Sequence, residues 1–83
     1  MSILENLENI LRTEVAVDLA KESLGADENL LEQGIIDSLG IMKLIIFIEK
    51  AFGIKVPDED VVPENFESLN SMARFIEQKM SNK

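Results

Sequence analysis

The chain has 83 residues, of which 46% are hydrophobic and 29% charged, and its formal net charge is −8. This length suits one small domain, residues 1–83, and the acidic balance argues against binding to nucleic-acid phosphates. The sequence holds no cysteine and no histidine, which excludes disulfides, thiolate zinc sites and a serine–histidine nucleophile pair.

Targeting and membrane signals are not visible. The N-terminal stretch 1–14 carries Glu5, Glu8 and Glu14 against a single Arg12, which is opposite in charge to the start of a secretory signal. No apolar run approaches the ~20 residues that cross a bilayer. We expect a cytoplasmic protein that does not insert into membranes.

The first predicted element is a helix over residues 3–16. Ser2 to Glu5 reads as a capping box, and Ile3, Leu7, Ile10 and Leu11 follow at helical spacing. Residues 16–24 are compatible with a continuation of this helix. Gly25 supplies a stop, and a long loop then leads to Gly34.

The second predicted helix covers residues 38–52 and ends at Gly53. At about 100° per residue, one face gathers core candidates: Ile41, Leu44, Ile45, Ile48 and Phe52. The opposite face gathers Leu39, Met42 and Ile46, beside Lys43, Glu49 and Lys50. This helix is apolar on two sides, so the outer stripe is either a docking face, or covered by a loop, or a set of ordinary exposed apolar residues.

The remainder predicts one short helix and one long one. Residues 54–66 read as loop with a short helical turn at 62–66, and Asp58-Glu59-Asp60 lacks the spacing of a calcium loop, which indicates a solvated acidic loop without metal. Ser68 caps a last helix over 68–80. Its predicted inner face consists of Leu69, Met72, Ala73, Ile76 and Met80.

Ser38 is the leading candidate for a working residue. The run Gly34 to Gly40 delivers this serine to the start of the second helix, where a hydroxyl ordinarily caps free N–H groups. Without a histidine base it cannot act as a hydrolase nucleophile. No catalytic constellation is visible, so we expect no enzyme, and any chemistry at Ser38 requires a second protein.

Several segments occur together in this chain: Asp37-Ser38-Leu39 at the start of the second helix, the apolar first helix, the loop Leu30 to Gly34, the exit Phe52 to Pro57, and Ser68-Leu69. In this combination they resemble the acyl and peptidyl carrier protein family. The resemblance covers nearly the whole chain. It implies an all-α four-helix bundle of the acyl-carrier-protein type, with three main helices, one short helix and a long loop between the first and second helices.

The resemblance also implies a cofactor and partners. Ser38 would receive a 4′-phosphopantetheine arm from coenzyme A through a phosphopantetheinyl transferase, with Asp37 and Leu39 as the neighbouring recognition residues. Asp37 is alternatively only a capping or turn residue. An acyl or aminoacyl group would then be carried on this arm as a thioester, and loading and transferring enzymes would be the partners of a monomeric carrier. No residue of the chain would catalyse bond formation on the cargo.

One departure from the fatty-acid-synthesis pattern concerns charge. Those carriers usually show acids along the second helix, whereas this chain has Gly40, Lys43 and Lys50 and keeps only Glu49, so residues 38–52 carry a net charge of +1 from two lysines and one glutamate. This indicates a carrier for a dedicated pathway, such as the D-alanyl type or carriers beside secondary-metabolite enzymes. The predicted docking residues are Leu39, Met42, Lys43, Ile46, Glu49 and Lys50.

Two alternatives remain at this stage. The first is an alternative to the carrier function: an unmodified helical interaction module that binds partners through the stripe Leu39, Met42 and Ile46, with Ser38 only as a cap. The second concerns whether a pocket for the cargo exists between the helices. One set of apolar residues would either line such a pocket or simply form core: Ile45, Ile48, Val62, Phe66, Leu69 and Ala73.

Overall fold

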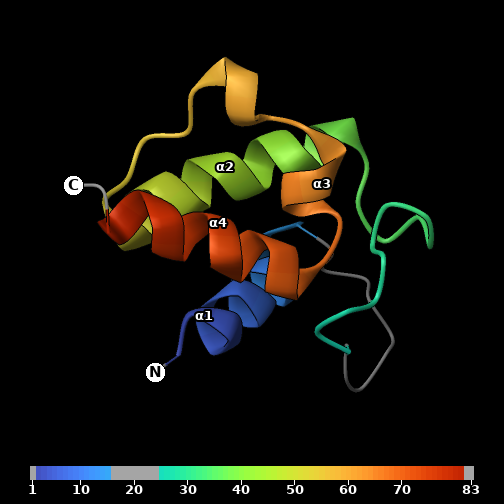
Figure 1. The fold of residues 1–83 in the computed structure, drawn as a ribbon. Coiled ribbons are helices and arrows are strands. Elements are labelled where there is room, and N and C mark those ends of the chain that lie inside the picture. Colours follow the sequence, from blue (N-terminus) through green and yellow to red (C-terminus); the bar gives the residue numbers. More distant parts are fainter. Residues whose placement is uncertain (1, 16–24, 82–83) are drawn as a thin grey trace.

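The computed structural model describes residues 2–15 and 25–81, and these ranges contain helices and connecting loops without a strand (Figure 1). The all-α architecture with three main helices and one short helix is therefore confirmed. The elements in chain order are α1 (Ile3–Ile10), the π-helical turn η1 (Leu11–Val15), α2 (Ser38–Phe52), the 3₁₀ turn η2 (Asp58–Asp60), α3 (Pro63–Phe66) and α4 (Leu69–Ser81).

α1 begins at the predicted cap. The Glu5 N–H donates to the Ser2 hydroxyl oxygen at 3.1 Å, and that hydroxyl donates to Glu5 Oε1 at 3.2 Å. The chain is helical over the described part of the expected helix, residues 3–15, but the helix widens into η1 from Leu11 onward. This wider turn keeps Leu11 in the core and brings Val15 against α2. The suggested continuation over residues 16–24 lies outside the described residues.

α2 has the expected two-sided character. Leu44 and Ile48 are fully buried, while Ile41, Ile45 and Phe52 are partly buried against the core. The helix ends at Gly53, whose φ of 65° is the left-handed conformation that glycine adopts at helix ends and whose N–H donates to the Glu49 carbonyl at 3.0 Å.

The segment after α2 contains more structure than one helical turn. Besides α3, which opens with Pro63, the acidic run forms η2. Lys79 Nζ of α4 lies 2.8 Å from Asp60 Oδ2, so this ion pair fastens η2 to α4. Within the described ranges no three His, Cys, Asp or Glu side chains are grouped to hold a metal ion.

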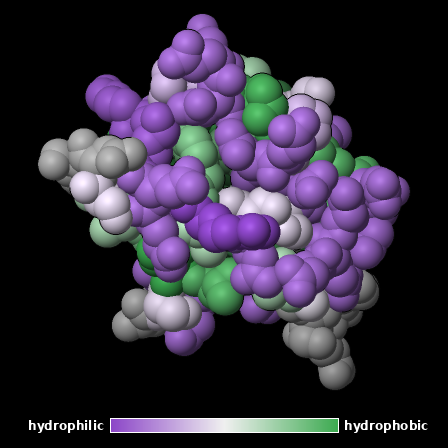
Figure 2. All heavy atoms as spheres, viewed as in Figure 1, coloured by the Kyte–Doolittle hydropathy of each residue, from purple (hydrophilic) through white to green (hydrophobic). Residues whose placement is uncertain are grey.

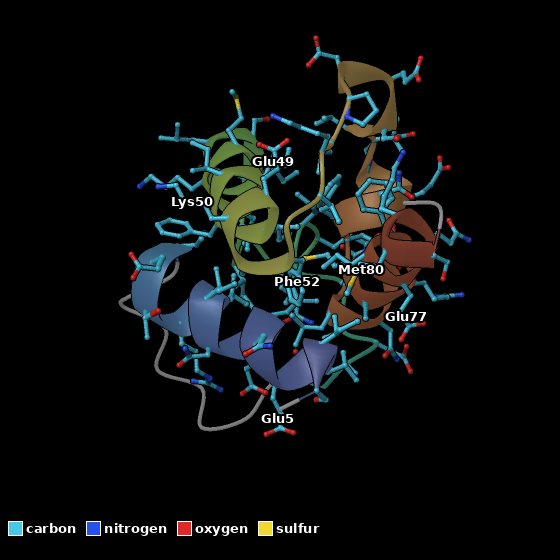
Figure 3. All side chains as sticks on the ribbon, turned by 90° about the vertical axis from the view of Figure 1, so that its left-hand side faces the viewer. Glu5, Glu49, Lys50, Phe52, Glu77 and Met80 are labelled. Atoms are coloured by element: carbon cyan, nitrogen blue, oxygen red, sulfur yellow. The ribbon has the colours of Figure 1, made fainter. Side chains whose placement is uncertain are left out.

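α4 is capped by Ser68, whose hydroxyl oxygen accepts from the Ser71 N–H at 3.1 Å. Two residues differ from the expected inner face. Phe75 is not part of the predicted core but is only 5% exposed, because the ring of Phe66 in α3 packs on its ring, with the two ring centroids 5.6 Å apart. Met80 was expected inside but is 43% exposed, because it lies in the last turn beyond the core residue Ile76 (Figure 3).

The core lies between α1, α2 and α4, with α3 closing one end (Figure 1). Four of the residues considered for a cargo gap, Ile48, Phe66, Leu69 and Ala73, are part of this packed cluster. No described helix has the length and apolar character to cross a bilayer. The buried apolar residues are Leu7, Leu11, Leu30, Ile36, Leu44, Ile48, Ile54, Phe66, Leu69, Met72, Ala73, Phe75 and Ile76.

Candidate functional site

The loop that leads to Ser38 is fastened at Leu30. The Leu30 N–H donates to the Glu67 carbonyl at 2.7 Å, which ties this loop to the junction of α3 and α4. The Leu30 carbonyl in turn accepts from the N–H groups of Ile35 and Ile36, at 2.9 and 3.3 Å. Leu30 and Ile36 are 0% and 4% exposed. The backbone just before Ser38 is therefore anchored by both hydrogen bonds and burial.

Gly34 turns the chain between these anchors. Its φ is 73°, and its N–H donates to the Leu31 carbonyl at 3.2 Å. A residue with a side chain is strained in this conformation, so glycine is required by the backbone rather than by lack of space. The turn directs Ile35 and Ile36 toward the start of α2.

Asp37 caps α2. Its backbone is extended, with φ −130° and ψ −170°, and its Oδ1 accepts from the Gly40 N–H at 2.8 Å. Its carbonyl accepts from the Ile41 N–H at 2.9 Å. The alternative in which Ser38 is the cap is therefore wrong, and the alternative in which Asp37 caps the helix is confirmed: Ser38 is the first residue inside the helix.

The Ser38 hydroxyl is left for other chemistry. The residue is exposed, and its hydroxyl forms no hydrogen bond to any described residue. The backbone N–H groups of the first helical residues have no partner within a helix, and the helix dipole favours an anion at this end. No acid lies in the first turn of α2. An exposed hydroxyl in this setting fits a phosphate ester.

Gly40 gives this end of α2 a feature that the sequence reading missed. A Cβ at position 40 would lie 3.3 Å from Val15 Cγ1, 3.4 Å from Ile36 Cβ and 3.5 Å from Asp37 Oδ1. Gly40 is buried, so the missing side chain allows η1 to pack directly against the helix start. The signal in the sequence was a glycine inside an apolar helix, which in general indicates a close approach.

The outer face of α2 is apolar and cationic. Leu39, Met42 and Ile46 are 65%, 62% and 52% exposed, and Lys43 and Lys50 are exposed beside them. Glu49 differs, because it is only half-buried and its Oε2 accepts from the Val56 N–H at 2.9 Å. Figure 3 shows Lys50 extending away from α1 and α4. The structure thus brings five of the six predicted docking residues to one exposed face, and Glu49 binds backbone instead.

Comparison with protein-family models gives a match to the phosphopantetheine attachment site family over residues 5–76. Among solved structures, the chain is similar to a holo acyl carrier protein from Nitrosomonas europaea, with a TM-score of 0.81 and 33% identity over 98% of this chain and 99% of that one. The described helices, including the start of α2, therefore have a counterpart in an acyl carrier protein that was solved in its holo form.

Curated relatives include D-alanyl carrier proteins. The protein from Lactococcus lactis subsp. lactis is 32% identical over 75 residues, which cover 90% of this chain and 92% of the relative. The protein from Streptococcus equi subsp. zooepidemicus is 40% identical over 52 residues, 63% of this chain and 66% of that relative. The match to the latter thus spans just under two thirds of the relative's length.

Proposed function

We propose that this chain, which belongs to the phosphopantetheine-attachment family of carrier proteins, bears its covalent 4′-phosphopantetheine on the Ser38 hydroxyl. The observation that supports this assignment is that one residue caps α2 and the next one is left without a structural role. Asp37 caps the helix, so the adjacent Ser38 hydroxyl is exposed and not used by the fold.

The residues at this end of α2 suit such an ester. Free N–H groups and the positive end of the helix dipole would stabilise the phosphate charge, and the anchored loop would hold the ester oxygen in a fixed place. The arm, once attached, supplies a thiol that holds a carboxylic acid as a thioester. Because the sequence has no histidine, the Ser38 proton would be removed by a base of the transferase.

We infer that the cargo is an aminoacyl or a specialised acyl group in a dedicated pathway. Two observations support this inference: relatives at 32% and 40% identity are D-alanyl carrier proteins, and the exposed face of α2 carries Lys43 and Lys50. The whole chain, residues 1–83, would then act as one monomeric carrier domain in the cytoplasm, without catalytic activity of its own.

The partners under this proposal are a phosphopantetheinyl transferase and the enzymes that load and unload the arm. Asp37 and Leu39 flank the attachment point, and the exposed stripe Leu39, Met42 and Ile46 starts one residue after it. A partner that reaches the arm would therefore contact this stripe. This position supports a role of the stripe in partner docking.

The test is the intact mass of the purified protein before and after incubation with coenzyme A, Mg²⁺ and a promiscuous phosphopantetheinyl transferase. We expect a gain of one phosphopantetheine unit in the parent and in Ser2→Ala, an exposed serine at another helix start, and no gain in Ser38→Ala. A folded parent that gains no mass would contradict the proposal. It would favour an unmodified interaction module that binds through the same stripe.

A further inference from the structure

A surface depression of about 440 Å³ lies at the C-terminal end of α2. We propose that this depression and the stripe Leu39, Met42 and Ile46, together called the α2 face, dock a protein surface whose apolar side chains are flanked by Asp or Glu. The inference rests on the proposed carrier function, because it specifies the chemistry of the partner enzymes. The depression is lined by Ile46, Glu49, Lys50, Gly53, Ile54 and Lys55.

The apolar part of the α2 face is continuous. Leu39, Met42 and Ile46 lie at i, i+3 and i+7 along one helix and are all more than half exposed. Ile46 also lines the depression, and Ile54, which is 5% exposed, contributes to its buried wall. Single exposed apolar side chains need no explanation, but a stripe that leads into a hollow is the shape of a docking site.

The charged residues that line the depression are Glu49, Lys50 and Lys55, which together carry a net charge of +1. Lys50 and Lys55 are exposed, and neither forms an ion pair with any residue in the described part of the chain. Glu49, the acid in the lining, directs its Oε2 to the Val56 N–H. Two lysines therefore present free ammonium groups beside an apolar hollow. A partner that places carboxylates there gains complementary pairs, whereas a basic partner meets repulsion.

An anionic membrane offers the same two chemistries, but it fits this molecule less well. A bilayer surface faces a whole side of a small protein, and this chain carries a net charge of −8. Figure 2 shows the α4 side of the molecule and not the α2 face, and that side is mostly hydrophilic, with small hydrophobic patches. Lys43, Lys50 and Lys55 are too few to bind an anionic bilayer strongly. A partner protein, in contrast, can place its carboxylates opposite these lysines and no charge elsewhere.

The probes for the test are two helical peptides with the same three leucines at i, i+4 and i+7. One peptide has glutamates at the flanking positions, and the other has lysines. Each is titrated into the ¹⁵N-labelled full chain, and the amide shifts of α2 give the dissociation constants. We expect the glutamate peptide to bind about threefold to tenfold more tightly, because exposed charge pairs each add a modest amount.

Two variants of equal charge change locate the effect. Lys50→Glu and Arg74→Glu each lower the net charge by two, and Arg74 is exposed on α4, outside the α2 face. We expect Lys50→Glu to abolish or reverse the peptide preference and Arg74→Glu to retain it. Equal preference in both variants would overturn the proposal, because the effect would then come from net charge alone.

Other outcomes also decide the matter. Equal affinity for the two peptides, tighter binding of the lysine peptide, or no shift of α2 amides with either peptide overturns the proposal. Shifts of α2 amides with phosphatidylglycerol vesicles but not with the peptides would assign the face to a membrane. Self-association that Lys50→Glu removes would assign it to a second copy of this chain, and both results overturn the acidic partner.

The mass measurement at Ser38 keeps the two proposals separate. It depends on a covalent bond at the start of α2 and not on the peptide preference. A chain that gains the arm but shows no preference overturns the partner chemistry and keeps the carrier function. A chain that shows the preference but gains no arm overturns the carrier function and keeps the acidic partner.

Discussion

At the scale of single residues, the two neighbouring polar residues at the start of α2, Asp37 and Ser38, have different roles. Asp37 stands in extended backbone just outside the helix, where its carboxylate reaches the Gly40 N–H. Ser38 stands one residue inside, where a side chain cannot make the same bond. Structural and functional roles are therefore separable by mutation at adjacent positions.

Asp37→Ala is expected to lower the free energy of unfolding by about 0.5–2 kcal/mol, because it removes the cap, whereas Ser38→Ala should change it by less than about 0.5 kcal/mol. Urea unfolding followed by circular dichroism measures both. Asp37→Asn serves as the control, since an asparagine caps about as well as an aspartate. A large loss in Ser38→Ala with none in Asp37→Ala would show that the serine is the cap after all.

This pair also marks what the sequence could and could not predict. The position of Ser38 at a helix start followed from Gly34 and from the apolar run after it. Which of two adjacent polar residues caps the helix depends on where the backbone leaves the extended conformation, and residue type does not decide that. Gly40 likewise has a role only because η1, distant in sequence, packs against it.

At the scale of elements, α2 is the helix that connects the core to the proposed partners. Its inner face is buried around Leu44 and Ile48, while its outer face leaves Met42 and Ile46 more than half exposed. The 3.6-residue period predicted both faces and, with Gly53, the end of the helix. It did not predict the burial of Phe75, because Phe66 covers that ring from α3, an element too short for a periodic signal.

The two faces of α2 should respond differently to the loss of one methylene-sized group. Ile48→Val is expected to cost about 0.5–1.5 kcal/mol of unfolding free energy, because Ile48 is fully buried. Ile46→Val, the same change on the exposed face, should stay within about 0.5 kcal/mol. Thermal or urea unfolding of both variants provides the comparison. Equal losses would mean that something in the protein covers the outer stripe.

At the scale of the whole molecule, charge is unevenly distributed. Residues 1–37 hold nine acids and two bases, a net of −7, while residues 38–83 hold seven acids and six bases, a net of −1. The total of −8 is large for 83 residues, and such a charge destabilises a compact state through self-repulsion. The exposed α2 face, with Lys43 and Lys50, is a local exception.

Self-repulsion predicts that moderate salt stabilises the fold. The free energy of unfolding should rise between about 0.01 M and 0.1 M NaCl, as the Debye length falls from roughly 30 Å to roughly 10 Å. Urea midpoints at several salt concentrations measure this. A variant with Glu32, Glu64 and Glu77 changed to glutamine, all three exposed, should show a smaller rise. A fall in stability with salt would mean that attractive pairs outweigh the repulsion.

The close contact between Gly40 and Val15 limits how this carrier can be re-engineered. A side chain introduced at position 40, to imitate the acidic second helix of other carriers, would place its Cβ 3.3 Å from Val15 Cγ1, so the Val15 side chain would have to shift by a few tenths of an ångström. A change of partner preference at that position would therefore also need space at Val15, whereas Lys43 and Lys50 are exposed and can be replaced without such a shift. Partner recognition in this chain is therefore easier to change at Lys43 and Lys50 than at Gly40.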